Sequence, residues 1–88
     1  MRGQFEIILS KQAVKYYQRL PLNIARRLDR AFLKLELNPL SGGDIRPLSG
    51  RLSGYRLRIG DLRVIYQIDK ENRLVFISAI LPRGDIYK

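Results

Sequence analysis

The segment "GYRLRIGDLRVIYQID", residues 54–69, constrains the fold more than any other part of the chain, because its pattern is typical of a β-hairpin. Apolar side chains alternate with Arg56 and Arg58, and successive side chains of a strand point to opposite faces. If Gly60-Asp61 is the two-residue turn, with glycine at the positive φ of a type II′ turn, Arg58 faces Arg63 across the hairpin. Like charges placed directly opposite each other destabilise a sheet, so this arrangement suggests a functional reason.

The segments before the hairpin have the patterns of one strand and two helices. The apolar run "FEIIL", residues 5–9, is β-prone and is followed by Ser10, a favourable N-cap. Helical spacing predicts a first helix from Lys11 to Leu20, which Pro21 interrupts. Pro21 fits the first turn of a second helix that ends near Asn38-Pro39. We expect the apolar stripe of this second helix to consist of Ile24, Leu28, Ala31, Phe32 and Leu35.

The rest of the chain predicts a long loop and three strands. Residues 38–54 are rich in Gly, Pro and Ser and therefore indicate a connecting loop. The hairpin strands, 55–59 and 62–69, follow it, and after the turn "IDKENR" a last strand over 74–81 ends at Pro82. The continuous apolar run in this last strand indicates either burial on both faces or a central place in the sheet.

These elements predict an α+β fold in the order β-α-α-β-β-β. Two N-terminal helices would pack on one face of a mostly antiparallel sheet. The other face would stay open, and the arginines of the hairpin would lie on it. We expect residues 1–88 to form a single domain, because a chain of this length can bury one small core.

Composition narrows the chemistry that is available to the chain. No apolar run approaches the roughly 20 residues of a membrane span, and the N-terminus lacks the pattern of a signal peptide, so we expect a cytoplasmic protein without a membrane partner. The absence of Cys and His leaves only carboxylates as metal ligands. We therefore expect no metal site and no cofactor.

Positive charge is the strongest global signal. Seventeen Lys and Arg against eight Asp and Glu give a net charge of +9, which favours a polyanionic partner such as nucleic acid or an acidic protein. Between positions 46 and 63 there is a single acid, Asp61, and five arginines that we regard as candidate RNA-binding residues: Arg46, Arg51, Arg56, Arg58 and Arg63. The alternative is that they form an ordinary solvated strand face that keeps the protein soluble.

The order of elements, the "YRLRIGDLRVIYQI" hairpin and the C-terminal "ILPRGDIYK" resemble the RelE branch of the RelE/ParE toxin superfamily. The resemblance spans essentially the whole chain and is most specific in the hairpin and in the Arg-x-x-x-Tyr pattern of Arg83 and Tyr87. It implies a toxin that cuts messenger RNA on the ribosome. It also implies a cognate antitoxin that holds the toxin inactive in a hetero-oligomeric complex.

The resemblance also implies five candidate catalytic residues. Arg56 and Arg58 match two basic positions of the family's second strand, which are often lysines, and Arg63 matches the basic residue that opens the next strand. Arg83 and Tyr87 match a C-terminal arginine and tyrosine. Arginine at the first two positions keeps the charge but does not readily give up a proton.

Metal-independent RNA cleavage by the 2′-OH group needs a base, cations for the charge on phosphorus and help for the leaving 5′-oxygen. Without histidine, Tyr87 is the candidate base, because neighbouring positive charge lowers the pKa of a phenol. The planar guanidinium groups of Arg56, Arg58 and Arg63 suit a phosphate clamp. Arg83 could stabilise the transition state or assist the leaving group.

Other interpretations of these residues and of the whole chain stay open. Tyr87 could anchor the C-terminal tail, and Arg83 could pair with Asp85 or Asp61. Arg26, Arg27 and Arg30 could form a solvated helix face, which an acidic partner or ribosomal RNA could use. For the whole chain, the alternatives are a ParE-like toxin that binds and inhibits DNA gyrase without nuclease activity, and a catalytically silent RNA-binding module.

Overall fold

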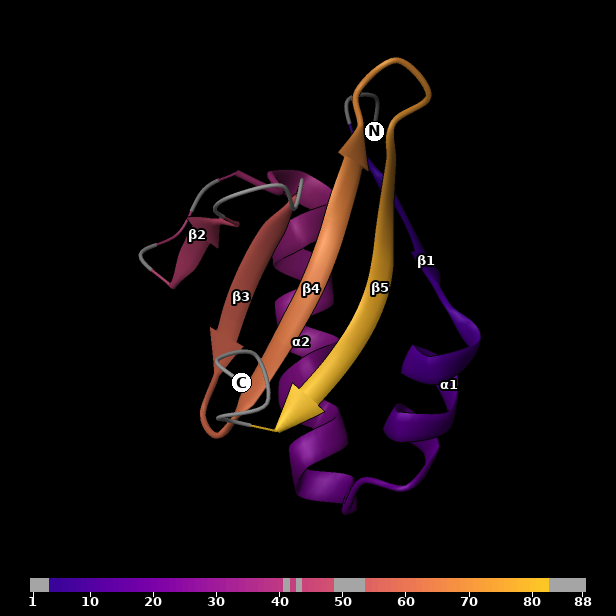
Figure 1. Ribbon diagram of the computed structural model, residues 1–88, viewed down its shortest axis with the longest axis vertical. Helices are drawn as coiled ribbons and strands as arrows, with labels where there is room; N and C mark the ends of the chain where they lie inside the picture. Colours follow the sequence, from indigo (N-terminus) through magenta and orange to yellow (C-terminus); the bar gives the residue numbers. More distant parts are fainter. Residues whose placement is uncertain (1–3, 41, 43, 49–53, 83–88) are drawn as a thin grey trace.

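The computed structural model describes residues 4–40, 42, 44–48 and 54–82, and it has two helices and one five-stranded sheet (Figure 1). The strands follow the order β1-β5-β4-β3-β2 across the sheet, and only β1 and β5 run parallel. The elements are β1 (Glu6–Leu9), α1 (Lys11–Gln18), α2 (Leu22–Leu37), β2 (Ile45–Pro47), β3 (Tyr55–Ile59), β4 (Leu62–Asp69) and β5 (Leu74–Pro82). The predicted α+β fold with a mostly antiparallel sheet is confirmed.

The structure adds the strand β2, whereas we expected residues 38–54 to form a loop. This three-residue strand pairs antiparallel with β3 at the edge of the sheet, so the order is β-α-α-β-β-β-β. The strand is difficult to predict from the sequence because it is short and contains proline. Pro47 has no backbone N–H, and proline is tolerated in a sheet mainly on an edge strand.

Both helices begin and end close to the predicted positions. The Ser10 hydroxyl accepts a hydrogen bond from the backbone N–H of Ala13 at 3.1 Å, which confirms it as the N-cap of α1. The same hydroxyl donates to the backbone oxygen of Ser78 at 2.7 Å, so the start of α1 is attached to β5. Pro21 is the N-cap of α2 and Asn38 is its C-cap.

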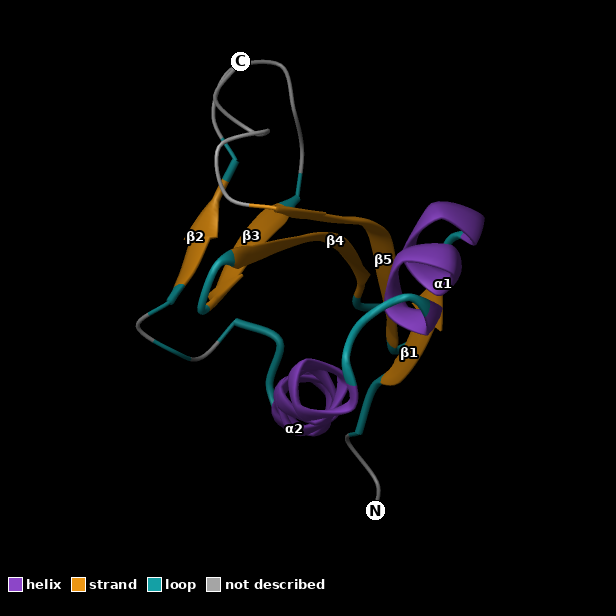
Figure 2. Cartoon of the chain, turned by 90° about the horizontal axis from the view of Figure 1, so that it is seen from below, coloured by secondary structure: helices purple, strands orange, loops and turns teal. Residues whose placement is uncertain are grey.

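The two helices contact the sheet in different ways (Figure 2). Helix α2 lies across one face, whereas α1 lies beside β1 and β5 at the end of the sheet. The parallel pairing of β1 stops at Leu9 opposite Ile77. Beyond that point the Gln12 side chain binds the backbone of Ile80, donating to its oxygen at 2.9 Å and accepting from its N–H at 3.0 Å. Gln12 thus continues the edge that β1 leaves unpaired.

The core lies between α2 and the sheet and also takes in Ala13 of α1. Tyr66 of β4 is fully buried, stacks on Tyr55 at 5.7 Å between ring centroids and donates a hydrogen bond to the Pro39 carbonyl at 2.6 Å. The predicted apolar stripe of α2 faces this core: Leu28 and Leu35 are buried, and the other three members pack against the buried cluster. The core is completed by Leu57, Leu62, Val64, Val75, Ile77 and Ile80.

The strand β5 is interior to the sheet, between β1 and β4, as its apolar run predicted. It is not buried on both faces, because Phe76 remains 42 % exposed. In the part of the chain that the structure describes, no helix covers the sheet face opposite α2 (Figure 2). This uncovered face is where the arginines of β2, β3 and β4 gather.

Candidate nucleic-acid interface

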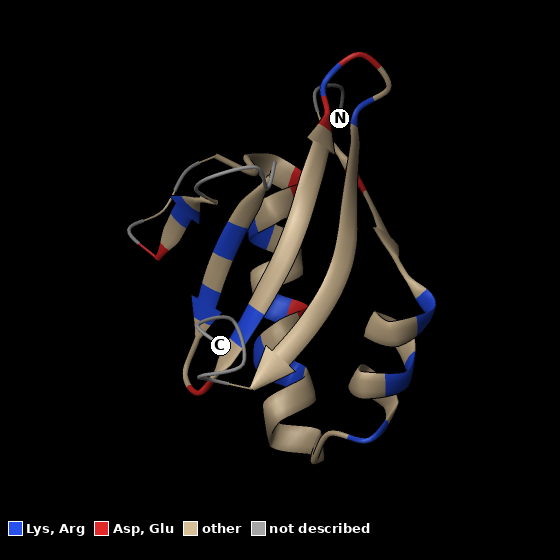
Figure 3. Ribbon diagram, in the orientation of Figure 1, with Lys and Arg blue, Asp and Glu red and all other residues tan. Residues whose placement is uncertain are grey.

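Arginines of three neighbouring strands lie side by side on the sheet (Figure 3). Arg46 of β2 is directly opposite Arg56 of β3, and Arg58 of β3 is directly opposite Arg63 of β4. The alternation of strand side chains places these four residues on the face away from Leu57 and the core. We call this set, Arg46, Arg56, Arg58 and Arg63, the arginine face.

The local cause of this register is the turn at Gly60-Asp61. Gly60 has a φ of +55°, and Ile59 pairs with Leu62, as a two-residue type II′ turn requires. The turn aligns Arg58 with Arg63, so the predicted opposition of the two charges is confirmed.

The guanidinium of Arg58 has an acidic partner in the structure. Its Nη2 donates to Asp44 Oδ1 at 3.0 Å, and both side chains are more than half exposed. A solvent-exposed pair of this kind contributes little stability and can be exchanged for another anion. A phosphate bound by Arg58 would therefore compete with Asp44.

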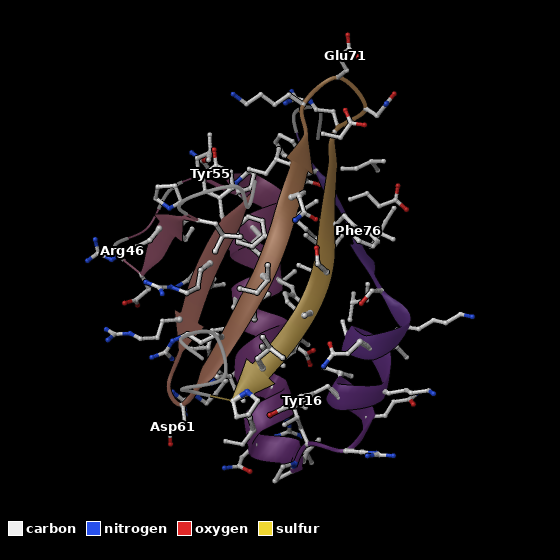
Figure 4. The ribbon with its side chains drawn as sticks, viewed as in Figure 1. Tyr16, Arg46, Tyr55, Asp61, Glu71 and Phe76 are labelled. Atoms are coloured by element: carbon white, nitrogen blue, oxygen red, sulfur yellow. The ribbon has the colours of Figure 1, made fainter. Side chains whose placement is uncertain are left out.

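Arg63 is the most buried member of the arginine face, at 7 % exposure. Its Nη1 donates to the backbone oxygens of Gly60 and Leu62 at 3.3 and 3.0 Å. Arg63 therefore stabilises the hairpin turn through these hydrogen bonds, and its charge contributes positive potential from a buried position in the sheet. Arg56 is half-buried and Arg46 is exposed on the edge strand, where it extends away from the sheet (Figure 4).

Three candidate residues, Arg51, Arg83 and Tyr87, lie outside the described residues, as does the proposed pairing of Arg83 with Asp85. Their roles stay predictions. The last described residue, Pro82, pairs with Leu62, so β5 ends beside the start of β4, where Arg63 lies.

Two described tyrosines are poor candidates for a base. The hydrogen bond from the Tyr17 hydroxyl to Asp29, at 2.6 Å, raises the pKa of Tyr17. Burial, with a smaller contribution from Tyr55, raises the pKa of Tyr66. A phenol is already protonated at neutral pH, and a raised pKa lowers the fraction of phenolate further, so both tyrosines are less suited to accept a proton than an ordinary tyrosine.

Within residues 4–40, 42, 44–48 and 54–82, no group of three or more Asp and Glu side chains is arranged to hold a metal ion. Neither helix of this part of the chain is long and apolar enough to cross a membrane.

A groove of about 390 Å³, which was not predicted from the sequence, lies between α2 and the β2–β3 edge of the sheet. Arg27, Arg30 and Lys34 line it from α2. We expected Arg26, Arg27 and Arg30 to form a solvated helix face that an acidic partner or ribosomal RNA could use. The spacing of these three cations along one side of a helix was the available signal. We call this cavity the α2 groove.

Comparison with known proteins gives consistent results. The model of the family described as "ParE toxin of type II toxin-antitoxin system, parDE" matches residues 7–87. A protein of Methanocaldococcus jannaschii named "Putative toxin RelE1" is 30 % identical over 87 residues, which cover 97 % of each chain.

Two solved structures share the fold. One is the archaeal RelE-RelB complex from Pyrococcus horikoshii OT3, with 31 % identity and a TM-score of 0.79 over 93 % of this chain and 98 % of that chain. The other is the toxin-antitoxin complex RelBE2 from Mycobacterium tuberculosis, with 28 % identity and a TM-score of 0.78 over 91 % of this chain and 99 % of that chain. With a family model that matches nearly its whole length and a relative 30 % identical over 97 % of it, this chain belongs to the RelE/ParE toxin superfamily and is a RelE-like toxin of a type II toxin–antitoxin system.

Proposed function

We propose that this toxin is a ribosome-dependent messenger RNA endoribonuclease, an mRNA interferase that blocks translation until a cognate antitoxin neutralises it. The observation that carries the proposal is the arginine face. Three neighbouring strands place four arginines on a sheet face that no described helix covers. Arg46, Arg56 and Arg58 are solvent-accessible, whereas the guanidinium of Arg63 is buried against the backbone of the turn. Such a face suits the phosphates of an RNA strand, because guanidinium binds phosphate with two hydrogen bonds.

The proposed chemistry uses the RNA's own 2′-OH and needs no metal. The 2′-oxygen attacks the adjacent phosphorus and its proton passes to a base. The bond from phosphorus to the 5′-oxygen then breaks, and that oxygen takes up a proton. The products are a 2′,3′-cyclic phosphate and a 5′-hydroxyl.

Each of the five candidate catalytic residues has a role in this scheme. Arg56 and Arg58 bind the phosphate, and Arg58 exchanges Asp44 for it. Arg63 adds positive charge from the start of β4. Tyr87 accepts the proton of the 2′-OH, and Arg83 stabilises the charge that develops on phosphorus.

The antitoxin completes the proposal. The similar structures from Pyrococcus and Mycobacterium are both toxin–antitoxin complexes, which supports a hetero-oligomer for this chain as well. A basic protein with a net charge of +9 fits an acidic partner. A ribosomal target places the proposed action in the cytoplasm.

One observation favours a second candidate function, because the matching family model is described as a ParE toxin. A ParE-like toxin would bind and inhibit DNA gyrase and would have no nuclease activity. Gyrase binding needs neither a phosphate clamp nor a base, so the arginine face favours the nuclease.

The test is single-turnover cleavage of messenger RNA on ribosomes. Tyr87→Phe removes one hydroxyl and should slow cleavage by about 10²- to 10⁴-fold, which is the usual worth of a positioned acid or base. Arg83→Ala should also slow it, with little change in ribosome binding. Tyr16→Phe, a matched removal of a hydroxyl on α1, should cut at the wild-type rate.

If Tyr87→Phe also cuts at that rate, the assignment of the base is wrong. If the wild-type protein leaves ribosome-bound messenger RNA intact and inhibits gyrase instead, the proposed activity is wrong and the ParE-like alternative holds.

A further inference from the structure

Among the aromatic residues that the structure describes, Phe76 of β5 is the one that takes no part in the core. It is 42 % exposed, whereas its neighbours along the strand, Val75 and Ile77, are fully buried. The alternation of strand side chains therefore places the Phe76 ring on the sheet face opposite the core. The other described aromatic residues belong to the buried cluster or pack against it: Phe5, Tyr16, Tyr17, Phe32, Tyr55 and Tyr66.

Phe76 lies on the same side of the sheet as the arginine face. It pairs with Gln67 of β4, and alternation along β4 puts Gln67, Ile65 and Arg63 on one side of that strand. Because Arg56 of β3 pairs with Ile65, Phe76 lies two strands across and two residues along from Arg56. Strand spacing and the rise per residue make this separation about 12 Å between Cα atoms. In Figure 4, Phe76 and Arg46 accordingly lie on opposite sides of β4.

The surface next to the ring is aliphatic on one side and polar on the other. Ile8 of β1 pairs with Phe76 and is 38 % exposed. On the other side, the Ser78 hydroxyl donates a hydrogen bond to Gln67 Oε1, so this polar group is already bound within the sheet. The aromatic ring is therefore the main feature that this part of the face offers to a ligand.

The position of the ring favours a nucleobase as that ligand. A peptide strand adds to a sheet at its edge, whereas β5 has β1 on one side and β4 on the other. Single-stranded RNA has both of the groups that the face requires, since its phosphates bind guanidinium and its bases stack on aromatic rings. RNA-recognition domains use the same combination, with aromatic side chains on an open sheet face as the stacking surface.

We propose that the Phe76 ring stacks on a base of the RNA strand whose phosphates bind the arginine face. That this strand is messenger RNA rests on the proposed function, whereas the stacking rests on the ring and its distance from the arginines. Every base has a π-face, so this subsite holds the strand without selecting its sequence by hydrogen bonds. Phe76 adds affinity and fixes the position of the strand, away from the phosphate at Arg56 and Arg58.

The test is a double-mutant cycle between the ring and each base of a short single-stranded RNA. Fluorescence anisotropy at constant salt gives the dissociation constants. Phe76→Leu keeps an apolar side chain but removes the ring, and each RNA variant lacks the base at one position. At one position, loss of the base should weaken binding to the wild-type protein at least about five-fold, the lower end of the usual worth of one stack. The same loss should leave binding to Phe76→Leu unchanged.

Two matched variants and one spectroscopic signal separate stacking from other effects. Phe76→Tyr keeps the aromatic face and should respond to the missing base as the wild type does. Ile8→Ala removes neighbouring apolar surface without touching the ring and should also keep this response. The fluorescence of 2-aminopurine at that RNA position should be quenched by the wild-type protein and not by Phe76→Leu.

Circular dichroism should show Phe76→Leu folded, because Phe76 is exposed and lies outside the buried cluster. If no single base distinguishes the wild type from Phe76→Leu, the ring does not stack on RNA and the inference is wrong. The same conclusion follows if Phe76→Tyr loses the response to the missing base as fully as Phe76→Leu does.

The outcome is separable from that of the proposed function, because the binding cycle requires no cleavage. If one base depends on the ring but the wild-type protein does not cleave messenger RNA on ribosomes, only the proposed function fails. If cleavage occurs and no base depends on the ring, only this inference fails. If both hold, Phe76→Leu should raise the toxin concentration that gives half the maximal cleavage rate and leave the maximal rate unchanged.

Discussion

Arg58 and Arg63 lie directly opposite each other across the β3–β4 hairpin, yet their guanidinium groups have different partners. Arg58 is paired with Asp44 at 3.0 Å, and Arg63 donates to the backbone oxygens of Gly60 and Leu62. The chain itself thus offsets the repulsion between the two charges. An opposed arginine pair therefore does not by itself require a bound phosphate, and the gathering of arginines from three strands is the stronger indication of an anionic ligand.

The Asp44–Arg58 pair predicts a gain in RNA affinity when the acid is neutralised. Asp44→Asn should free the Arg58 guanidinium for phosphate and tighten binding of a short RNA about two- to five-fold, because an exposed pair is worth up to about 1 kcal/mol. Fluorescence anisotropy at constant salt measures the dissociation constant. In the background Arg58→Ala the gain should disappear.

The control for this prediction is Glu71→Gln, which makes the same change in net charge. Glu71 lies in the turn between β4 and β5, at the opposite end of the sheet from the hairpin turn that contains Asp61 (Figure 4). Screening by salt should leave this variant close to wild type. A gain as large as that of Asp44→Asn would mean that net charge, and not the release of Arg58, governs RNA binding.

The buried hydroxyl of Tyr66 predicts a loss of stability in Tyr66→Phe. The substitution leaves the buried Pro39 carbonyl without its hydrogen-bond donor, which should cost about 1 to 2 kcal/mol in the free energy of unfolding. Urea denaturation at pH 7 measures it, with Tyr16→Phe as the comparison. An unchanged midpoint for Tyr66→Phe would show that the hydrogen bond contributes no net stability.

The same residue predicts the direction of alkaline destabilisation. Burial raises the pKa of Tyr66 in the folded state above the ordinary value of 10.0. Above pH 10 the unfolded chain releases this proton before the folded protein does, so the stabilisation is complete below pH 10 and is lost as pH rises toward the folded-state pKa. The wild-type protein should therefore lose stability more steeply than Tyr66→Phe above pH 10 in denaturation at a series of pH values.

Replacing either of two glycines with alanine should destabilise the protein, and the loss should be larger at Gly54 than at Gly60. At Gly54, φ is +113° and an added Cβ would lie 2.5 Å from the backbone oxygen of Tyr66, which cannot move without breaking the sheet. At Gly60, φ is +55° and the nearest atom is the Arg27 guanidinium at 2.9 Å, the free end of a flexible side chain. We expect Gly54→Ala to cost about 3 kcal/mol and Gly60→Ala about 1 kcal/mol in the free energy of unfolding. Thermal unfolding in the reverse order would contradict this account of the two sites.

The hydrogen bonds that attach α1 to the edge of β5 predict a loss of stability in Gln12→Ala. The substitution removes both hydrogen bonds to the backbone of Ile80 and should destabilise the protein by about 1 to 2 kcal/mol. Gln18→Ala, at the exposed end of α1, removes the same side chain without these contacts and should have little effect. Hydrogen exchange at the Ile80 amide is the local measurement, and only Gln12→Ala should accelerate it.

Local patterns were sufficient to predict most elements of this fold. The alternation in residues 55–69, the turn at Gly60-Asp61 and the N-cap Ser10 all follow from interactions between residues close in sequence. The opposition of Arg58 and Arg63 was predictable for the same reason, because a two-residue turn determines the register of its hairpin. Strand β2 was not, since a three-residue edge strand containing proline exists only through its pairing with β3.

The hairpin, the helices with their apolar stripes and the clustering of arginine are predictable from the sequence, because each depends on spacing along the chain. The ion pair of Arg58 depends instead on tertiary contacts, since Asp44 lies fourteen residues away in sequence and meets Arg58 through the pairing of β2 with β3. The α2 groove likewise exists because an edge strand and a helix far apart in sequence are packed on the same core. Spacing along the chain carries no information on such contacts, which depend on how the whole chain packs.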